Sequence, residues 1–139
     1  MKNKLNLLVA EDNPDELFFI LRTLKRLEYV ETLETVSDGL QVIEMFSRLM
    51  KDGQAARLPD VLILDLRMPR KSGFDVLNWM RERKVKCPVI VHTSSDDPAE
   101  AAKAIDLGAA AIVVKEVHYN PLIGQLAGMF RRPNLKSQA

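Results

Sequence analysis

Three carboxylates, a hydroxyl and an ammonium follow short apolar runs of the sequence, and together they could carry out phosphoryl chemistry. Glu11 and Asp12 follow LNLLVA, Asp65 follows VLIL, Thr93 closes VIVHT, and Lys115 follows AAIVV. Three carboxylates brought together repel, by about 4 kcal/mol per pair at ~4 Å and an effective dielectric constant near 20. Such a cluster needs a cation, and oxygen donors that leave room for water and phosphate favour Mg²⁺.

The same residue types are suited to covalent phosphoryl transfer. An aspartate is a competent nucleophile towards phosphorus, and the transfer depends mainly on positioning and on neutralising charge. One carboxylate could attack while the others hold the metal. Lys115 would add a second cation, and Thr93 would donate its hydroxyl to a phosphoryl oxygen.

The elements that must position these residues alternate between strands and helices. Apolar runs separate stretches with apolar residues at helical spacing, which is typical of βα units around a parallel sheet. The sequence therefore predicts an α/β fold of the (βα)5 type, with helices on both faces and 31–36 as an edge strand because its polarity alternates. The predicted strands are Leu5–Ala10, Glu31–Val36, Val61–Asp65, Val89–Thr93 and Ala110–Lys115. Because ligands bind at the carboxyl ends of such strands, the candidate residues should share one edge.

Capping residues predict where the helices begin and end. Asn13 and Asp97 each precede a proline and, at the third helical position, an acid, which predicts capping boxes, and Asn120 offers a third start. Gly108 is expected to end the fourth helix in a left-handed conformation. Inward-facing residues are expected at Leu17, Ile20, Leu21, Leu24 and Leu27 in the first helix, at Leu40, Ile43, Phe46 and Met50 in a helix at about 39–50, and at Phe74, Leu77 and Met80 in one at about 74–84.

Length and composition favour one globular domain. The 139 residues are 47% hydrophobic and 28% charged, which suffices for a sizeable core. A net charge of +1 favours neither nucleic acid nor an anionic membrane as a partner. The first apolar run is too short for a signal peptide or a membrane span. Cys87 is the single cysteine, which excludes an intrachain disulfide, and we expect a cytoplasmic protein.

Over nearly its whole length the chain resembles the receiver domains of two-component response regulators. The resemblance is carried, in order, by LLVAEDNPDE, VLILDLRMPRKSGFDVL, VIVHTSS and AAIVVK. The spacings are also similar, with 53 residues from Asp12 to Asp65, 28 from Asp65 to Thr93 and 22 from Thr93 to Lys115. The resemblance implies a doubly wound, flavodoxin-like fold with strand order 2-1-3-4-5.

The resemblance also implies a role for each candidate residue. Asp65 would be the phospho-acceptor, the pair Glu11–Asp12 would bind Mg²⁺, and Arg67 would be a further ligand through its backbone carbonyl. Thr93 would be the hydroxyl that responds to phosphorylation, and Lys115 would contact the phosphoryl group. Such a protein is a phosphoryl acceptor with slow self-dephosphorylation and not a turnover enzyme.

Two positions depart from the family's pattern. Glu116 follows the lysine where the family usually has a proline, often in a cis peptide. Ile112 stands three residues before the lysine, where an aromatic often changes rotamer with the hydroxyl. The threonine and aromatic switch is therefore not expected in its usual form.

The partners implied are a sensor histidine kinase or a phosphotransfer protein. The VAEDNPDE and MPRKSG segments are similar to single-domain regulators that serve bacterial phytochromes and other sensor kinases. Only 24 residues follow Lys115, so we expect a stand-alone receiver domain at 1–132 and a short polar tail at 133–139. Partner contact or a homodimer is expected on the face of the fourth helix, the strand at 110–115 and the fifth helix, including Ile112, His118, Tyr119 and Met129.

Other residues have plainer interpretations. His92 and His118 lack a partner at metal-ligand spacing, so structural or surface roles are expected. Cys87, directly before a proline, is expected to be a small buried residue, and Trp79 a packing residue. Arg131 and its neighbour Arg132 are expected to form a basic helix end.

Three other functions compete with the phosphorylation switch. An interaction-only receiver with constitutive output would keep the site, and Ile112 and Glu116 make it conceivable. A phosphatase of the haloacid dehalogenase type also forms an aspartyl phosphate, but the Asp it normally has two residues after the nucleophile is Arg67 here. A flavodoxin is excluded, because the acids at 11, 12, 15 and 16 would repel the phosphate that its first loop cradles.

Overall fold

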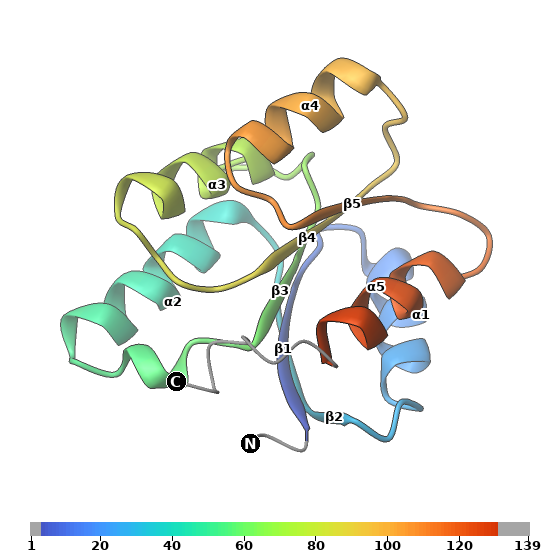
Figure 1. The fold of residues 1–139 in the computed structure, drawn as a ribbon, viewed down its shortest axis with the longest axis horizontal. Coiled ribbons are helices and arrows are strands. Elements are labelled where there is room, and N and C mark those ends of the chain that lie inside the picture. The colour runs from blue at the N-terminus through green and yellow to red at the C-terminus, as the bar shows by residue number, and fades with distance from the viewer. Residues whose placement is uncertain (1–3, 131–139) are drawn as a thin grey trace.

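The computed structural model describes residues 4–130, which form a parallel β-sheet between two layers of helices. The sheet has the order β2-β1-β3-β4-β5 (Figure 1), which confirms the expected topology and places β2 at an edge. The strands are β1 (Leu5–Ala10), β2 (Val30–Val36), β3 (Val61–Leu64), β4 (Val89–Thr93) and β5 (Ala111–Val114).

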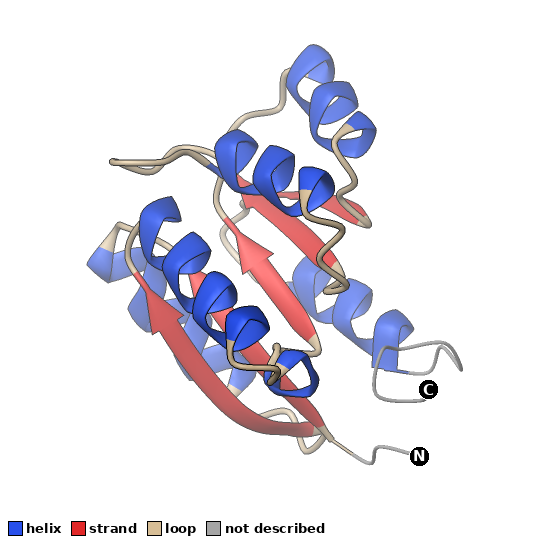
Figure 2. Ribbon diagram, turned by 90° about the vertical axis from the view of Figure 1, so that its left-hand side faces the viewer, coloured by secondary structure: helices blue, strands red, loops and turns tan. Residues whose placement is uncertain are grey.

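Helices cover both faces of the sheet (Figure 2). They are α1 (Pro14–Leu24), α2 (Gly39–Lys51), α3 (Gly73–Glu82), α4 (Pro98–Asp106) and α5 (Asn120–Phe130), with a 3₁₀ turn at Ala55–Arg57. α1 and α5 pack on the face that carries Leu7 and Ile63, whereas α2, α3 and α4 pack on the face that carries Leu8 and Leu62. The central strands are buried on both faces, which explains their unbroken apolar sequences.

Two helices differ in detail from the prediction. α1 ends at Leu24, and Leu27 follows in a turn in which its N–H bonds to the Leu24 carbonyl three residues back, yet Leu27 still packs against the core. In α2 the buried residues are Gly39, Val42 and Phe46, whereas Leu40 and Met50 are half-buried and are not among the residues packed against the core, so the prediction that these two face the core with Phe46 was wrong. At about 100° per residue, Leu40 lies roughly 200° from Val42 and cannot share its face.

The predicted capping boxes of α1 and α4 do not form. Their N-cap side chains, on Asn13 and Asp97, accept backbone N–H bonds as expected, but the acids at the third position bond elsewhere, Glu16 to Tyr119 and Glu100 to Arg67. A complete capping box occurs instead at α3, where the Ser72 and Asp75 side chains accept each other's backbone N–H.

Three helices end with a residue in the left-handed conformation. In each case the N–H of the following residue bonds to the carbonyl five positions back, which is a Schellman motif. The left-handed residues are Gly53 (φ 70°) after α2, Lys84 (φ 55°) after α3 and Gly108 (φ 109°) after α4. Gly108 was predicted for this role; the lysine after α3 was not.

The predicted tail at 133–139 and the pair Arg131–Arg132 lie outside the described residues. Among residues 4–130, no helix has both the length and the apolar character needed to cross a bilayer.

Candidate phosphoryl and metal site

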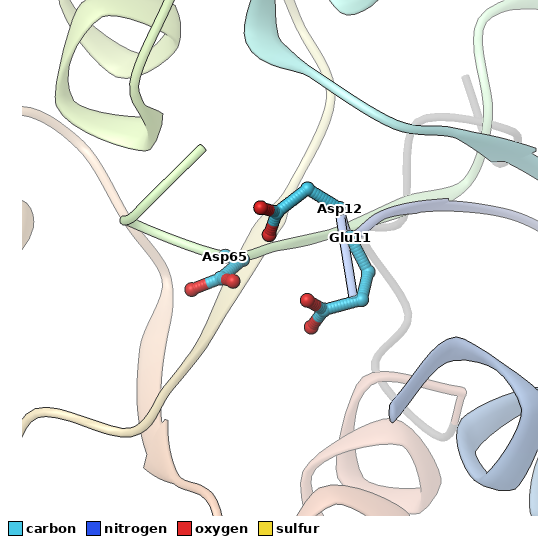
Figure 3. Close-up of side chains that lie close together, drawn as sticks. All are labelled: Glu11, Asp12 and Asp65. Atoms are coloured by element: carbon cyan, nitrogen blue, oxygen red, sulfur yellow. The ribbon is translucent and has the colours of Figure 1, made fainter. Parts of the chain in front are cut away.

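The register of the sheet brings the ends of β1 and β3 together. Ala10 pairs with Leu64, and the Asp65 N–H donates to the Ala10 carbonyl at 3.1 Å. Since Glu11 and Asp12 follow Ala10 directly, two strands deliver three carboxylates to one point (Figure 3). One oxygen from each carboxylate lies within 4.8 Å of the others. The structure thus forms the expected acidic cluster at the carboxyl edge of the sheet.

The donor set of this cluster fits a hard divalent cation. Glu11 and Asp65 are buried, whereas Asp12 is exposed, so the cluster is open to solvent on one side. A hollow of about 570 Å³ adjoins Asp12 and the loop 66–69, which leaves room for water and a phosphoryl group. All-oxygen donors with open positions favour Mg²⁺ over the softer transition metals.

Lys115 supplies the positive charge of the site. Its N–H donates to the Thr93 carbonyl at 2.7 Å, which fixes the residue at the end of β5. Its Nζ lies 2.8 Å from Glu11 Oε1 and 3.4 Å from Asp65 Oδ2. Burial alone would lower the pKa of Lys115, but the hydrogen bond to Glu11 and the charges of Asp65 and Glu11 raise it above its usual value. Lys115 is therefore an ammonium in this site.

Glu11 lies deepest of the three acids, and its surroundings disfavour its charge. Burial raises the pKa of Glu11 to about 7; the Lys115 hydrogen bond opposes the rise and the Asp65 charge adds to it. The Asn13 N–H donates to Glu11 Oε2 at 3.1 Å, which ties the carboxylate to the start of α1. Three acids beside one ammonium form a site that a divalent cation would stabilise.

Thr93 ends β4 at the same edge and begins a short series of side-chain caps. Its buried hydroxyl accepts the Ser95 N–H at 3.1 Å, and Ser95 Oγ accepts the Asp97 N–H at 3.2 Å. Asp97 in turn caps α4 through the Ala99 N–H at 2.9 Å. The position of Thr93 was expected; its connection to the first turn of α4 was not.

Arg67 gives a second connection between the acceptor loop and α4. Its N–H donates to Asp65 Oδ1 at 3.3 Å, and its guanidinium forms an ion pair with Glu100 in the first turn of α4. The two residues are 33 positions apart in sequence, and no local pattern indicates the pair. The metal-binding role of the Arg67 carbonyl stays a prediction.

Close backbone approaches shape the loop after Asp65. A Cβ on Gly73 would lie 2.5 Å from the Asp65 carbonyl oxygen, and one on Gly39 would lie 2.1 Å from the Lys71 carbonyl oxygen. In both cases the opposing atom belongs to the backbone, so it cannot move away without a shift of the chain. Glycine is therefore required at the start of α2 and of α3.

Arg70 holds the same loop from its other side. Its backbone has a positive φ of 65°, and its Nη2 and Nε lie 2.6 and 2.7 Å from Asp38 Oδ2. Burial would raise the pKa of Asp38, but hydrogen bonds from Gln41 and Arg70 hold it below its usual value. Asp38 is thus both the N-cap of α2 and an anchor for the loop, a pairing that sequence analysis missed.

The predicted partner face is only partly exposed. Met129 is buried against the sheet with Leu122 and Leu126, so its assignment to this face was wrong. The spacing of four and then three residues places these three side chains on one helical stripe. Ile112 is half-buried in the core between the sheet and the helices α2, α3 and α4, and His118 is exposed.

Comparison with known proteins identifies the fold and its family. The sequence matches the response regulator receiver domain family over residues 7–127. It is 28% identical over 130 residues to the response regulator MprA of Mycobacterium ulcerans, covering 94% of this chain and 52% of MprA, so the chain spans about half the length of that relative.

Solved receiver domains superpose on nearly the whole structure. The receiver domain of the putative response regulator NarL from Mycobacterium tuberculosis aligns with a TM-score of 0.79 at 25% identity, covering 93% of this chain and 98% of that one. The isolated receiver domain of RcsB from Salmonella enterica serovar Typhimurium, solved in the presence of the phosphomimetic BeF₃⁻, aligns with a TM-score of 0.75 at 27% identity, covering 90% and 87%. The chain therefore belongs to the response regulator receiver domain family.

Proposed function

We propose that this domain is a phosphorylation-controlled switch in which Asp65 accepts a phosphoryl group from a sensor histidine kinase or a phosphotransfer protein. The observation that carries the proposal is the buried Asp65 carboxylate, 3.4 Å from the Lys115 ammonium and beside the pair Glu11–Asp12. The phosphomimetic used with the related RcsB receiver domain supports the same chemistry here. A bacterial phytochrome is one candidate among such kinases.

The transfer is a substitution at phosphorus. An Asp65 carboxylate oxygen attacks, an O–P bond forms, and the donor's P–N bond, or the P–O bond of acetyl phosphate, breaks with its electron pair on the leaving group. Lys115 neutralises charge on the phosphoryl oxygens, and the Thr93 hydroxyl donates to one of them. Mg²⁺ bound by Glu11, Asp12, Asp65 and the Arg67 carbonyl would add charge neutralisation. Water later hydrolyses the acyl phosphate, which resets the switch.

The signal leaves the site through the first turn of α4. Thr93 reaches this turn through Ser95 and Asp97, and Arg67 reaches it through Glu100. A phosphoryl group that draws the Thr93 hydroxyl away from the Ser95 N–H would loosen the first of these connections. We place the output on the face formed by α4, β5 and α5, where a partner or a second copy would bind.

Intact-mass spectrometry after incubation with acetyl phosphate tests the proposal. With Mg²⁺, the wild type should gain one phosphoryl group, whereas Asp65→Asn, or the wild type in EDTA, should gain none. Hydrogen exchange then tests the output, because residues 94–106 should exchange faster after phosphorylation. Phosphorylation with unchanged exchange there, and unchanged self-association, would favour the interaction-only receiver.

A further inference from the structure

Tyr119 makes a specific contact with α1 that the phosphoryl chemistry itself does not require. Its hydroxyl donates to Glu16 Oε2 at 2.5 Å across a sequence separation of 103 residues. Its backbone carbonyl accepts the Ile123 N–H at 2.9 Å, so the same residue also begins α5. Glu16 accepts this bond in place of the capping-box bond expected of it, which does not form.

The segment between Lys115 and Tyr119 is otherwise weakly held. Glu116, Val117 and His118 are exposed, with Val117 fully so at 101%. Glu116 occupies the position after the lysine, and no cis peptide bond occurs within residues 4–130. Within the stretch, His118 Nδ1 accepts the Asn120 N–H at 3.4 Å, a local bond to the first residue of α5. The stretch is therefore attached to the rest of the domain by its two ends, Lys115 in the acidic cluster and Tyr119 on α1.

The contacts at the two ends belong to one closed ring. Glu11 accepts the Asn13 N–H at the N-terminus of α1, and Glu16 lies in the first turn of the same helix. From Glu16 the ring continues through Tyr119 and the exposed segment to Lys115, whose Nζ returns to Glu11 at 2.8 Å. A fixed length of chain and three polar contacts thus set where the Lys115 ammonium lies relative to the acids.

The surroundings of Tyr119 keep its ring in place. The His92 ring lies beside it, with centroids 6.0 Å apart and an interplanar angle of 57°, and His92 is only 2% exposed. Burial and the nearby charge of Lys115 lower the pKa of His92 to about 4, so the imidazole is neutral. A neutral ring fills the space between Tyr119 and the sheet without competing with Lys115 for the carboxylates.

We propose that Tyr119 and Glu16 are positioning residues for Lys115: their hydrogen bond closes the ring that holds the ammonium at the phosphoryl site. The inference rests on the proposed phosphoryl transfer to Asp65. The hydrogen bond between Tyr119 and Glu16 holds the loop that follows Lys115 against α1. Glu16 and Tyr119 are neither proposed metal ligands nor reacting groups, so they act on the phosphoryl site through the ring and through the charges of Glu11 and Lys115 that lie near them.

The test compares three variants by the rate of phosphorylation with acetyl phosphate at saturating Mg²⁺. Tyr119→Phe keeps the ring and loses the hydroxyl, Glu16→Ala loses the acceptor, and Glu16→Gln retains an oxygen that accepts the same bond. Because misplaced catalytic groups cost up to about 100-fold, we expect Tyr119→Phe and Glu16→Ala each to slow the reaction by about 3- to 10-fold. The double variant should be no slower than either, Glu16→Gln should stay within about twofold of wild type, and the Mg²⁺ concentration for half-maximal rate should not change.

A stability control and a second readout separate positioning from a structural role. Gly108→Ala strains a left-handed residue far from the ring and should lower the melting temperature without slowing the reaction. The ¹³Cε resonance of Lys115, assigned with Lys115→Arg, should broaden in Tyr119→Phe. In Glu16→Gln, which removes a charge that acts on Lys115 but keeps the hydrogen bond, the resonance should shift without broadening. An unchanged rate and resonance in Tyr119→Phe, or an equal loss of rate in Gly108→Ala, would overturn the inference. If even the wild type is not phosphorylated, the proposed function fails, and the Lys115 resonance still decides whether the ring positions the ammonium.

Discussion

The Lys115 ammonium lies 2.8 Å from a carboxylate oxygen of Glu11, and both side chains are largely withdrawn from solvent, at 14% and 2% exposure. The pair joins the end of β5 to the end of β1 across the intervening strands β3 and β4. It therefore holds the sheet edge together while keeping a positive charge next to Asp65. Breaking it should affect both stability and chemistry.

Lys115→Met should lower the free energy of unfolding by about 1–3 kcal/mol, because it leaves Glu11 and Asp65 buried without their cation. Partial protonation of Glu11, whose pKa is already raised to about 7, limits the loss. Urea unfolding at pH 7 without divalent ions measures it. The double variant Lys115→Met with Glu11→Gln should recover part of the loss, and a double variant less stable than Lys115→Met would contradict the ion-pair account.

Asp65→Asn should raise the free energy of unfolding in EDTA by roughly 1 kcal/mol, and the melting temperature with it. The substitution removes one of three clustered acids and keeps the size of the side chain. Added Mg²⁺ should stabilise the wild type and leave Asp65→Asn nearly unchanged. Thermal unfolding with EDTA and with 10-fold steps of Mg²⁺ checks both. A lower melting temperature for Asp65→Asn in EDTA would show that the acids do not repel as described.

His92 should make stability fall with acidification between pH 6.5 and about 4. Its folded pKa of about 4 lies below its ordinary 6.5, so the unfolded state binds the proton first. The contribution of the neutral His92 to the free energy of unfolding is about 3 kcal/mol. It is fully present above pH 6.5, declines as the pH falls, and is lost by about pH 4. The difference in unfolding free energy between the wild type and His92→Phe should therefore change by about 3 kcal/mol between pH 6.5 and pH 4. Parallel pH profiles of the two proteins would contradict a neutral, buried His92.

Lys84→Gly should stabilise the domain by about 0.5–1 kcal/mol, because a lysine at φ 55° pays for a left-handed backbone that glycine adopts freely. Gly108→Ala, at the equivalent position after α4, should destabilise by about 1 kcal/mol. Nothing lies within 4 Å of a Cβ there, so the effect is one of the backbone alone. Thermal unfolding of both variants gives opposite signs if the two helix ends are equivalent, and the same sign if they are not.

The sequence predicted the fold and the cluster because both depend on local patterns. Unbroken apolar strands and capping residues indicate βα units, and parallel topology then brings residues that follow strands to one edge. Glu11, Asp12, Asp65 and Lys115 follow strands, and Thr93 is the last residue of one. Their meeting follows from topology without knowledge of any side-chain contact.

Contacts between distant segments could not be predicted in this way. Arg67 with Glu100, Arg70 with Asp38 and Tyr119 with Glu16 each join two surface elements whose relative placement depends on packing. The acids at the third position of α1 and α4 match a capping box, yet a nearby tyrosine or arginine competes for them. The prediction for Leu40 was wrong for a different reason. The apolar residues of α2 are compatible with two alternative inward-facing stripes, and the structure buries the stripe of Val42 and Phe46.

The most direct test of the central claim locates the phosphoryl group after Mg²⁺-dependent reaction with acetyl phosphate. Borohydride reduces an acyl phosphate to an alcohol, and trypsin then releases Leu58–Arg67, which contains both Asp65 and the fully buried Asp60 as an internal control. Fragment ions should place the reduced residue at position 65 in the wild type and show no reduction in this peptide in EDTA. Reduction at position 60, in another peptide, or nowhere under conditions that phosphorylate another receiver domain would contradict the assignment of Asp65 as the acceptor.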